Sequence, residues 1–302
     1  MIDLSTPTVP RMGVQVDWTG PGGDVWHLTD YHNSPVIMVN QAVSGFGNPQ
    51  IDHRTQDIAG LHGSRWRGWN AKARQISVPV LVWSGEGSQW TDVAERWWSS
   101  IKPDVEGTLT VTTPTGRCRH ILARADTGDD SFDRDPSSAG WAFSVAHLLA
   151  TDPFWVGEPI SMLWSNKAGV NWLGGGAPSA QGSATPFYIM PGGLGGATVI
   201  TNSGDVPAWP LWTVTGPCES VSLAVDEAVI AAPIHLADGQ QMVIDSDPRR
   251  QTVIVDGVDR ISELTSAVFQ PIPAGADRHL TLHMEGTGSV EVEISPKFLR
   301  AW

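Results

Sequence analysis

The sequence predicts a mainly β protein with one α-helix in an N-terminal domain and an all-β sandwich in a C-terminal domain. A single apolar stripe at helical spacing lies between Trp90 and Ile101. Short runs of β-branched and apolar residues, separated by turn residues, fill most of the remaining chain. A glycine- and proline-rich stretch divides the two parts. We therefore expect an N-terminal domain over 1–158, a linker or arm over 159–204 and a sandwich over 205–302.

Composition favours a protein whose surface is covered by other subunits. The chain has 302 residues, of which 41% are hydrophobic and only 17% are charged, against roughly 25% charged residues in typical soluble domains. Its net charge of −13 argues against nucleic-acid binding, which normally requires a basic surface. The one basic cluster, Arg65, Arg67, Lys72 and Arg74, is interpreted as a solvated loop or a contact with an anion or a partner.

The cysteines and the apolar segments indicate where the protein is made. Cys118 and Cys218 are expected in different domains and reduced, since a secreted disulfide scaffold carries more cysteines. The first residues show no signal peptide, and no run reaches the ~20 apolar residues that span a bilayer. We expect synthesis in a cytoplasm without membrane insertion.

The N-terminal domain begins with short strands at Val14–Trp18 and Val36–Val39. In Arg74–Trp83, the residues Ile76, Val78, Val80 and Val82 alternate onto one face. Pro79 lacks an N–H to donate, which predicts an edge strand or an irregularity.

A helix is predicted over 88–101. Its apolar stripe recurs at spacings of three and four residues and must pack on a sheet. Ser88 is a suitable N-cap and Pro103 ends the helix. The stripe consists of Trp90, Val93, Ala94, Trp97, Trp98 and Ile101.

A hairpin follows the helix. Gly107–Thr113 and Arg117–Arg124 are its strands, and the turn at Pro114 and Gly116 joins them. The five aspartates of the acidic loop 126–135 suggest a calcium site. Their spacing does not match an EF-hand loop, so a solvated loop is the preferred interpretation. Trp141–Leu149 is predicted as a mostly buried strand.

The second half is predicted to be all-β. Residues 159–204 hold ten glycines and four prolines and are interpreted as a linker or as an arm that orders on a partner. Turn residues then separate short strands at the spacing typical of a sandwich. The predicted strands are Leu211–Thr215, Val221–Val225, Val229–Ala231, Met242–Asp245, Thr252–Asp256, Leu280–Met284 and Ser289–Ile294.

The sequence contains no recognised catalytic or cofactor motif. The histidines are scattered without metal-ligand spacing, and we predict no metal, no cofactor and no catalytic residue. Glycoside hydrolysis needs a pair of carboxylates. With 32 acidic residues some pair always looks suitable, so this pattern does not distinguish a glycoside hydrolase. The 15 tryptophans suggest a sugar-stacking role, for which Trp172, Trp209, Trp212 and Trp302 are candidates, or core packing.

The order of these parts resembles the distal tail protein (Dit) family of long-tailed bacteriophages, also called minor tail proteins. The residues that carry the resemblance are Gly60–Gly63, Arg74 with Ile76–Val82, Ser88–Ile101, Pro103 with Gly107–Val111, Ala150–Trp155, Asn202–Asp205, Trp212–Pro217, Ile244–Asp245 and Val255–Gly257. The resemblance implies a belt domain that forms a hexameric ring and a galectin-like C-terminal sandwich. It transfers no catalytic residue, and the glycine-rich stretch departs from the compact family pattern.

The leading hypothesis is therefore a non-enzymatic component of the tail tip. Its partners would be copies of itself, the tail tube protein and the tail-tip or tail-associated lysin protein. It would reside at the distal end of the tail in the virion, after assembly in the host cytoplasm. The candidate ring-interface residues are Arg74, Ile76, Val78, Val80, Val82, Leu109 and Val111. A protein that binds a host-surface glycan through Trp209 and Trp212 is the alternative, followed by a glycoside hydrolase or cell-wall lysin.

Overall fold

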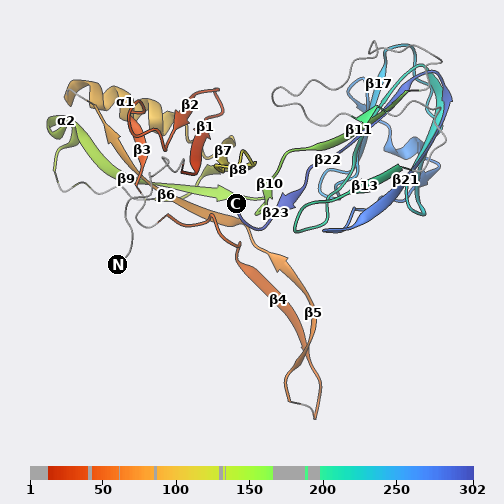
Figure 1. The fold of residues 1–302 in the computed structure, drawn as a ribbon, viewed down its shortest axis with the longest axis horizontal. Coiled ribbons are helices and arrows are strands. Elements are labelled where there is room, and N and C mark those ends of the chain that lie inside the picture. The colour runs from red at the N-terminus through yellow and green to blue at the C-terminus, as the bar shows by residue number, and fades with distance from the viewer. Residues whose placement is uncertain are drawn as a thin grey trace, which may run out of the picture. The chain divides into compact units, whose positions relative to one another are not determined.

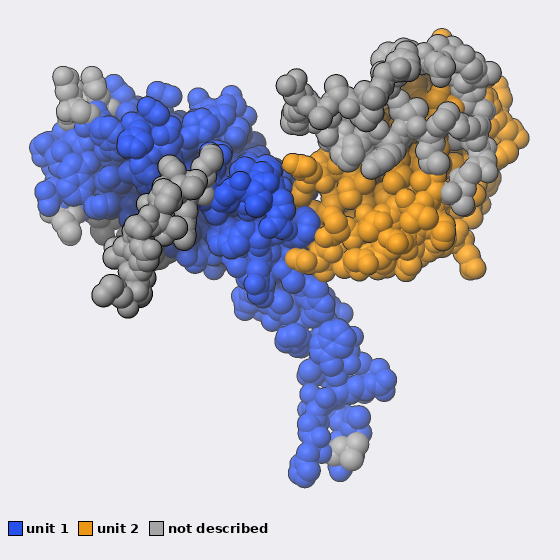
Figure 2. Space-filling model, viewed as in Figure 1, with its two compact units in different colours: residues 1–156, 298–302 blue, residues 157–297 orange. Residues whose placement is uncertain are grey.

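A computed structural model describes residues 13–39, 43–60, 62–84, 87–128, 132, 134–165, 188–189 and 198–302. The chain forms two compact units, and Figure 2 distinguishes them by colour. Unit 1 comprises residues 1–156 and 298–302, and unit 2 comprises residues 157–297. Both units are built mainly from strands (Figure 1), which confirms the predicted fold class. Within the described residues, no helix has the length and apolarity to cross a bilayer.

Unit 1 is built on an antiparallel sheet whose strands follow the order β2-β1-β7-β8-β9-β6-β3. The long ladder between β6 and β9 pairs all ten residues of each strand. Strand β10 pairs with β8 and with β23, the strand near the C-terminus. The bounds are β1 Gln15–Thr19, β2 Val25–His27, β3 Val36–Met38, β6 Arg74–Trp83, β7 Gly107–Thr112, β8 Cys118–Ala125, β9 Trp141–Ala150, β10 Trp155–Val156 and β23 Lys297–Phe298.

The predicted amphipathic helix is present as α1, Gly87–Ser99. Its apolar stripe packs into the core of unit 1, where Ala94 and Trp97 are buried and Trp97 meets Trp26 edge-to-face at 5.5 Å. The helix ends two residues earlier than predicted, because Ser100 and Ile101 continue only as a hydrogen-bonded turn. A second, short helix, α2 at Pro136–Ala139, lies between the predicted acidic loop 126–135 and the predicted strand that begins at Trp141, and Asp135 caps it.

A long hairpin extends from unit 1 (Figure 1). Its strands are β4, Ile51–Asp57, and β5, Ser64–Ala71, and they pair only with each other in the described part of the chain. Most of its residues are exposed on both faces, in contrast to the alternating burial along β6. At its base, Trp69 packs against Phe154 with ring centroids 6.4 Å apart.

Unit 2 consists of two sheets that share one hydrophobic core, the arrangement of a β-sandwich. The first sheet has the order β12-β11-β22-β14-β17-β18-β19, and the second has the order β13-β21-β15-β16-β20. The bounds are β11 Ile160–Ser165, β12 Tyr188–Ile189, β13 Thr198–Thr201, β14 Leu211–Thr215, β15 Cys218–Val225, β16 Ala228–Ala232, β17 Gln241–Asp245, β18 Thr252–Val255, β19 Val258–Asp259, β20 Ser266–Ala267, β21 Asp277–Gly286 and β22 Ser289–Ile294, with a 3₁₀ turn η1 at Ile261–Glu263.

The boundaries of the units differ from the predicted segments at two places. Strands β11, β12 and β13 lie inside the predicted linker, yet they belong to the sandwich, because β11 pairs with β22 and β12, and β13 pairs with β21. Residues 298–302 lie inside the predicted sandwich domain but belong to unit 1. Most of the predicted linker, residues 166–187 and 190–197, lies outside the described residues. Both differences arise from pairing between segments that are far apart in the chain.

Candidate functional site

Arg74, a predicted interface residue, is buried at the start of β6 with 2% of its surface exposed. Its Nε donates to the carbonyl of Pro153 at 2.7 Å, and its Nη2 donates to that of Leu299 at 2.8 Å. Its Nη1 donates to the carbonyls of Gly45 and Gly47. Burial lowers the pKa of Arg74 to about 10, so the side chain remains charged at neutral pH. Arg74 therefore joins three segments of unit 1 and does not face outward.

The other predicted interface residues are also internal. Ile76, Val78, Val80, Val82, Leu109 and Val111 are each at most 1% exposed and belong to the hydrophobic core of unit 1. Nor is β6 an edge strand, because it lies between β9 and β3. The carbonyl of Pro79 accepts from the N–H of Val39 on the β3 side, and the missing N–H of Pro79 faces that same side. The predicted interface residues of β6 and β7 are therefore core residues of unit 1.

The exposed hairpin β4–β5 is a surface that sequence reasoning missed. Trp66 is 60% exposed and Ile58 is 45% exposed. Arg65 and Arg67 of the basic cluster lie on β5, and Lys72 follows it. Lys72 pairs with Asp52 at 3.0 Å, and Arg67 donates to the amide oxygen of Gln56 at 2.9 Å. No alternating pattern could have revealed these strands, because neither face is buried.

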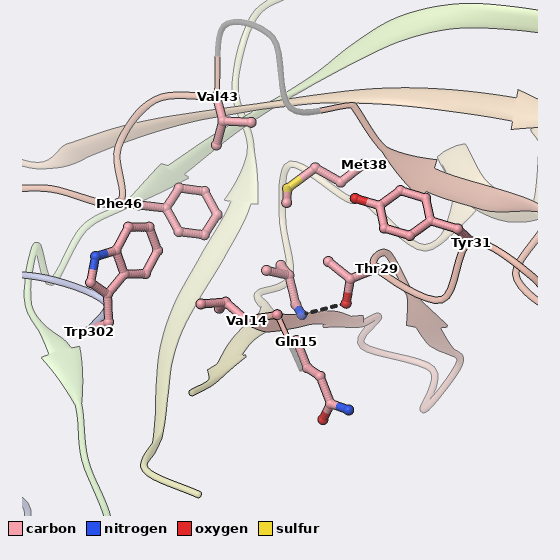
Figure 3. Close-up of a pocket in the computed structure, with 10 residues that line it drawn as sticks. Val14, Gln15, Thr29, Tyr31, Met38, Val43, Phe46 and Trp302 are labelled. Carbon is pink, nitrogen blue, oxygen red and sulfur yellow. Dashed lines mark hydrogen bonds between the residues drawn. The ribbon is translucent and has the colours of Figure 1, made fainter. Parts of the chain in front are cut away.

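A pocket of about 790 Å³ opens in unit 1 between the start of the chain and its end (Figure 3). The rings of Phe46 and Trp302 form one wall, with centroids 5.7 Å apart, and Tyr31 and Met38 stand opposite. Among the described lining residues, the phenol of Tyr31 is the one titratable side chain. The described lining residues are Gly13, Val14, Gln15, Val16, Thr29, Tyr31, Met38, Val43, Phe46 and Trp302. This chemistry suits an apolar contact and offers no acid–base pair.

The two tryptophans proposed for glycan stacking do not form a platform. Trp212 is completely buried in the core of unit 2, so it packs the sandwich. Trp209 is half-buried. Trp302 is 54% exposed but belongs to unit 1, and Trp172 lies outside the described residues. Burial leaves the Trp212 ring no exposed face on which a sugar could stack.

The described residues contain no group of three His, Cys, Asp or Glu side chains that could hold a metal ion. In the acidic loop, Asp126 accepts from Gln75, and Asp135 caps α2. Residues 129–131 and 133 of that loop lie outside the described part. Cys118 and Cys218 are free and lie in different units, as predicted, and burial raises the pKa of the Cys218 thiol.

An ionic cluster around Asp247 stabilises the fold of unit 2. Asp247, between β17 and β18, is buried and accepts two hydrogen bonds from the Arg249 guanidinium, at 3.0 Å and 2.6 Å. Lys297 lies 4.0 Å from the same carboxylate. The hydrogen bonds from Arg249 lower the pKa of Asp247 to about 2 against the opposing effect of burial.

Comparison with known proteins relates this architecture to phage tails. No family model matches the chain, and no curated protein matches it. Solved structures do match. SPP1 Dit (gp 19.1), described as a paradigm of the hub adsorption apparatus in phages that infect Gram-positive bacteria, aligns with a TM-score of 0.62 and 13% identity over 94% of this chain and 99% of its own.

Two structures of the phage P2 baseplate in its activated conformation also match. The structure with Ca aligns at a TM-score of 0.56 and 13% identity, over 94% of this chain and 98% of the other. The structure with Sr aligns at 0.52 and 12%, over 93% and 97%. The fold is therefore shared over nearly the full length of both units. This chain has the fold of the phage distal tail and baseplate proteins, as the resemblance in sequence predicts.

Proposed function

We propose that this chain is a structural component of the distal end of a phage tail. In this proposal, copies of the chain form a hexameric ring that connects the tail tube to the tail-tip or receptor-binding apparatus. The end-to-end match to SPP1 Dit and to the phage P2 baseplate chains supports a tail role. The mature protein would reside in the virion, after assembly in the host cytoplasm.

The observation that carries the proposal is the hairpin β4–β5. Two strands that pair only with each other are marginally stable in water. This hairpin exposes most of both faces, including Trp66 and Ile58. Unpaired strand edges and exposed large apolar side chains are the features that a second protein surface covers. An arm of this kind fits a subunit that completes its structure by assembly.

The proposal includes no enzymatic step. In the part of the chain that the structure describes, the apolar pocket of unit 1 is lined by one titratable side chain, the phenol of Tyr31. The most strongly bound ionisable groups, Arg74 and Asp247, spend their hydrogen bonds on backbone carbonyls and on a neighbouring guanidinium. These two groups therefore hold the fold together.

The test is the mass of the purified protein by light scattering, with negative-stain images of the same peak. We expect a particle of six chains with a central hole. Antibodies against the chain should label the distal end of the tails of phage particles. A protein that stays monomeric at high concentration and is also missing from tail particles would overturn the proposal.

A further inference from the structure

The β6–β9 ladder carries an apolar surface on the side that faces away from the core. Trp83 pairs with Trp141, and Leu81 pairs with Phe143, so these four side chains lie on one face. Trp83, Trp141 and Phe143 are 38%, 37% and 56% exposed. The Trp141 and Phe143 rings meet edge-to-face at 5.4 Å. We call these four residues the outer ladder face.

A cluster of exposed aromatic side chains on one sheet face is uncommon on a protein that works alone. Tryptophan and phenylalanine are also the residues that most often anchor protein–protein contacts. Among the described residues, Arg134 is placed over the Trp141 ring at 5.1 Å, which leaves the Phe143 side of the cluster uncovered. The outer ladder face therefore has the chemistry of a docking surface.

The hairpin β4–β5 has the complementary character. It presents Trp66 and Ile58 for apolar contact. Its three arginines, Arg54, Arg65 and Arg67, outnumber its two aspartates, although the chain as a whole has a net charge of −13. The rest of a second copy is therefore strongly acidic, and this opposite charge attracts the hairpin toward a second copy over long range.

The hairpin β4–β5 and the outer ladder face lie at opposite ends of strand β6. Strand β5 ends at Ala71 and β6 begins at Arg74, where the hairpin leaves the sheet (Figure 1). Trp83 lies at the far end of β6, roughly 30 Å from Arg74 at ~3.3 Å per residue. The hairpin points away from the ladder, so its tip does not cover the outer ladder face of its own chain.

We propose that the hairpin β4–β5 of one copy docks on the outer ladder face of a second copy, with Trp66 and Ile58 packed on Trp141 and Phe143. The contact joins two different surfaces, so each copy can donate one hairpin and accept another. Such a head-to-tail contact closes into a ring when its rotation permits. The inference rests on the proposed ring and names the surfaces that form it.

The test is a crosslink between two differently tagged chains that are co-expressed. One chain carries Trp66→Cys and the other Phe143→Cys, both with Cys118→Ser so that a short bismaleimide meets only the introduced thiols and the buried Cys218. We expect a crosslinked pair that contains both tags. The matched control combines Trp66→Cys with Val258→Cys, at an exposed site of unit 2, and should give no such pair.

A second variant tests the same contact without a crosslinker. Phe143→Glu should lose the assembled species in light scattering while keeping its circular dichroism spectrum, and Val258→Glu should keep both. Rings of unsubstituted protein whose Trp66 and Phe143 sites do not crosslink would overturn the docking surface and leave the proposed function intact. Failure of the unsubstituted chain to assemble, alone or in tails, would overturn both.

Discussion

The guanidinium of Arg74 connects parts of unit 1 that are distant in sequence. It donates to carbonyls before β10, in the loop at Gly45 and Gly47, and near the C-terminus at Leu299. Hydrogen bonds from a charged donor contribute roughly 1.5–3 kcal/mol each, and they oppose the cost of burying the charge, which lowers the pKa of Arg74. The arginine that sequence reasoning assigned to a subunit interface is therefore an internal clamp.

Asp247 makes the stability of unit 2 depend on pH. Its pKa of about 2 lies below the unfolded value of 3.8. The carboxylate therefore stabilises the fold above about pH 4, and this contribution is lost as the pH falls from about 4 to about 2.

Asp247→Asn should accordingly lower the free energy of unfolding at pH 7 by about 1–2 kcal/mol, because the half-exposed Arg249 is partly screened. The variant should also lose less stability than the natural protein between pH 4 and pH 2. Denaturant titrations across this range provide the measurement, and Asp238→Asn, at an exposed position, is the control. Parallel acid curves for the natural protein and Asp247→Asn would contradict the assignment.

At the scale of elements, α1 supplies an aromatic side chain to the core of unit 1. Trp97 is 1% exposed, whereas Trp98 is only half-buried. We predict that Trp97→Ala lowers the free energy of unfolding by about 3–5 kcal/mol. Trp98→Ala should cost less, and Glu95→Ala, on the exposed side of the helix, should have little effect. Thermal and denaturant unfolding followed by near-ultraviolet circular dichroism distinguish the three variants.

The opposite pattern would be informative too. If Trp97→Ala unfolded normally but failed to assemble, the apolar stripe of α1 would be a subunit contact.

The hairpin β4–β5 differs from α1, because it buries neither of its faces. Its strands pair with each other, and Trp69 packs against Phe154 of unit 1 at its base.

At the scale of the whole molecule, residues 298–302 follow unit 2 in sequence but complete unit 1. Arg74 and Arg119 donate to the carbonyls of Leu299 and Arg300, both at 2.8 Å. The Arg119 guanidinium also lies 3.6 Å from the centre of the Phe298 ring. Unit 1 is therefore completed only after residues 298–302 have been synthesised.

Truncation after Lys297 should lower the stability of unit 1 by roughly 3 kcal/mol or more, since it leaves buried donors unpaired and opens a cavity. Unit 2 should keep its stability. Removal of the exposed Trp302 alone should have a much smaller effect. Hydrogen exchange of both units in the truncated and full-length proteins measures the difference, and unchanged protection in unit 1 would contradict the prediction.

The sequence alone determined the fold class, the helix and most strands of both units. Strands β6, β9, β14 and β22 each bury one face, so apolar residues recur at every second position of their sequences. The helix α1 also buries one face, so its apolar residues form a stripe at helical spacing. The tertiary structure decided that β6 is internal, that β11 joins the sandwich and that residues 298–302 return to unit 1. It also revealed β4–β5, whose two exposed faces impose no pattern on the sequence. Local periodicity records which face is buried, whereas only long-range pairing decides what buries it.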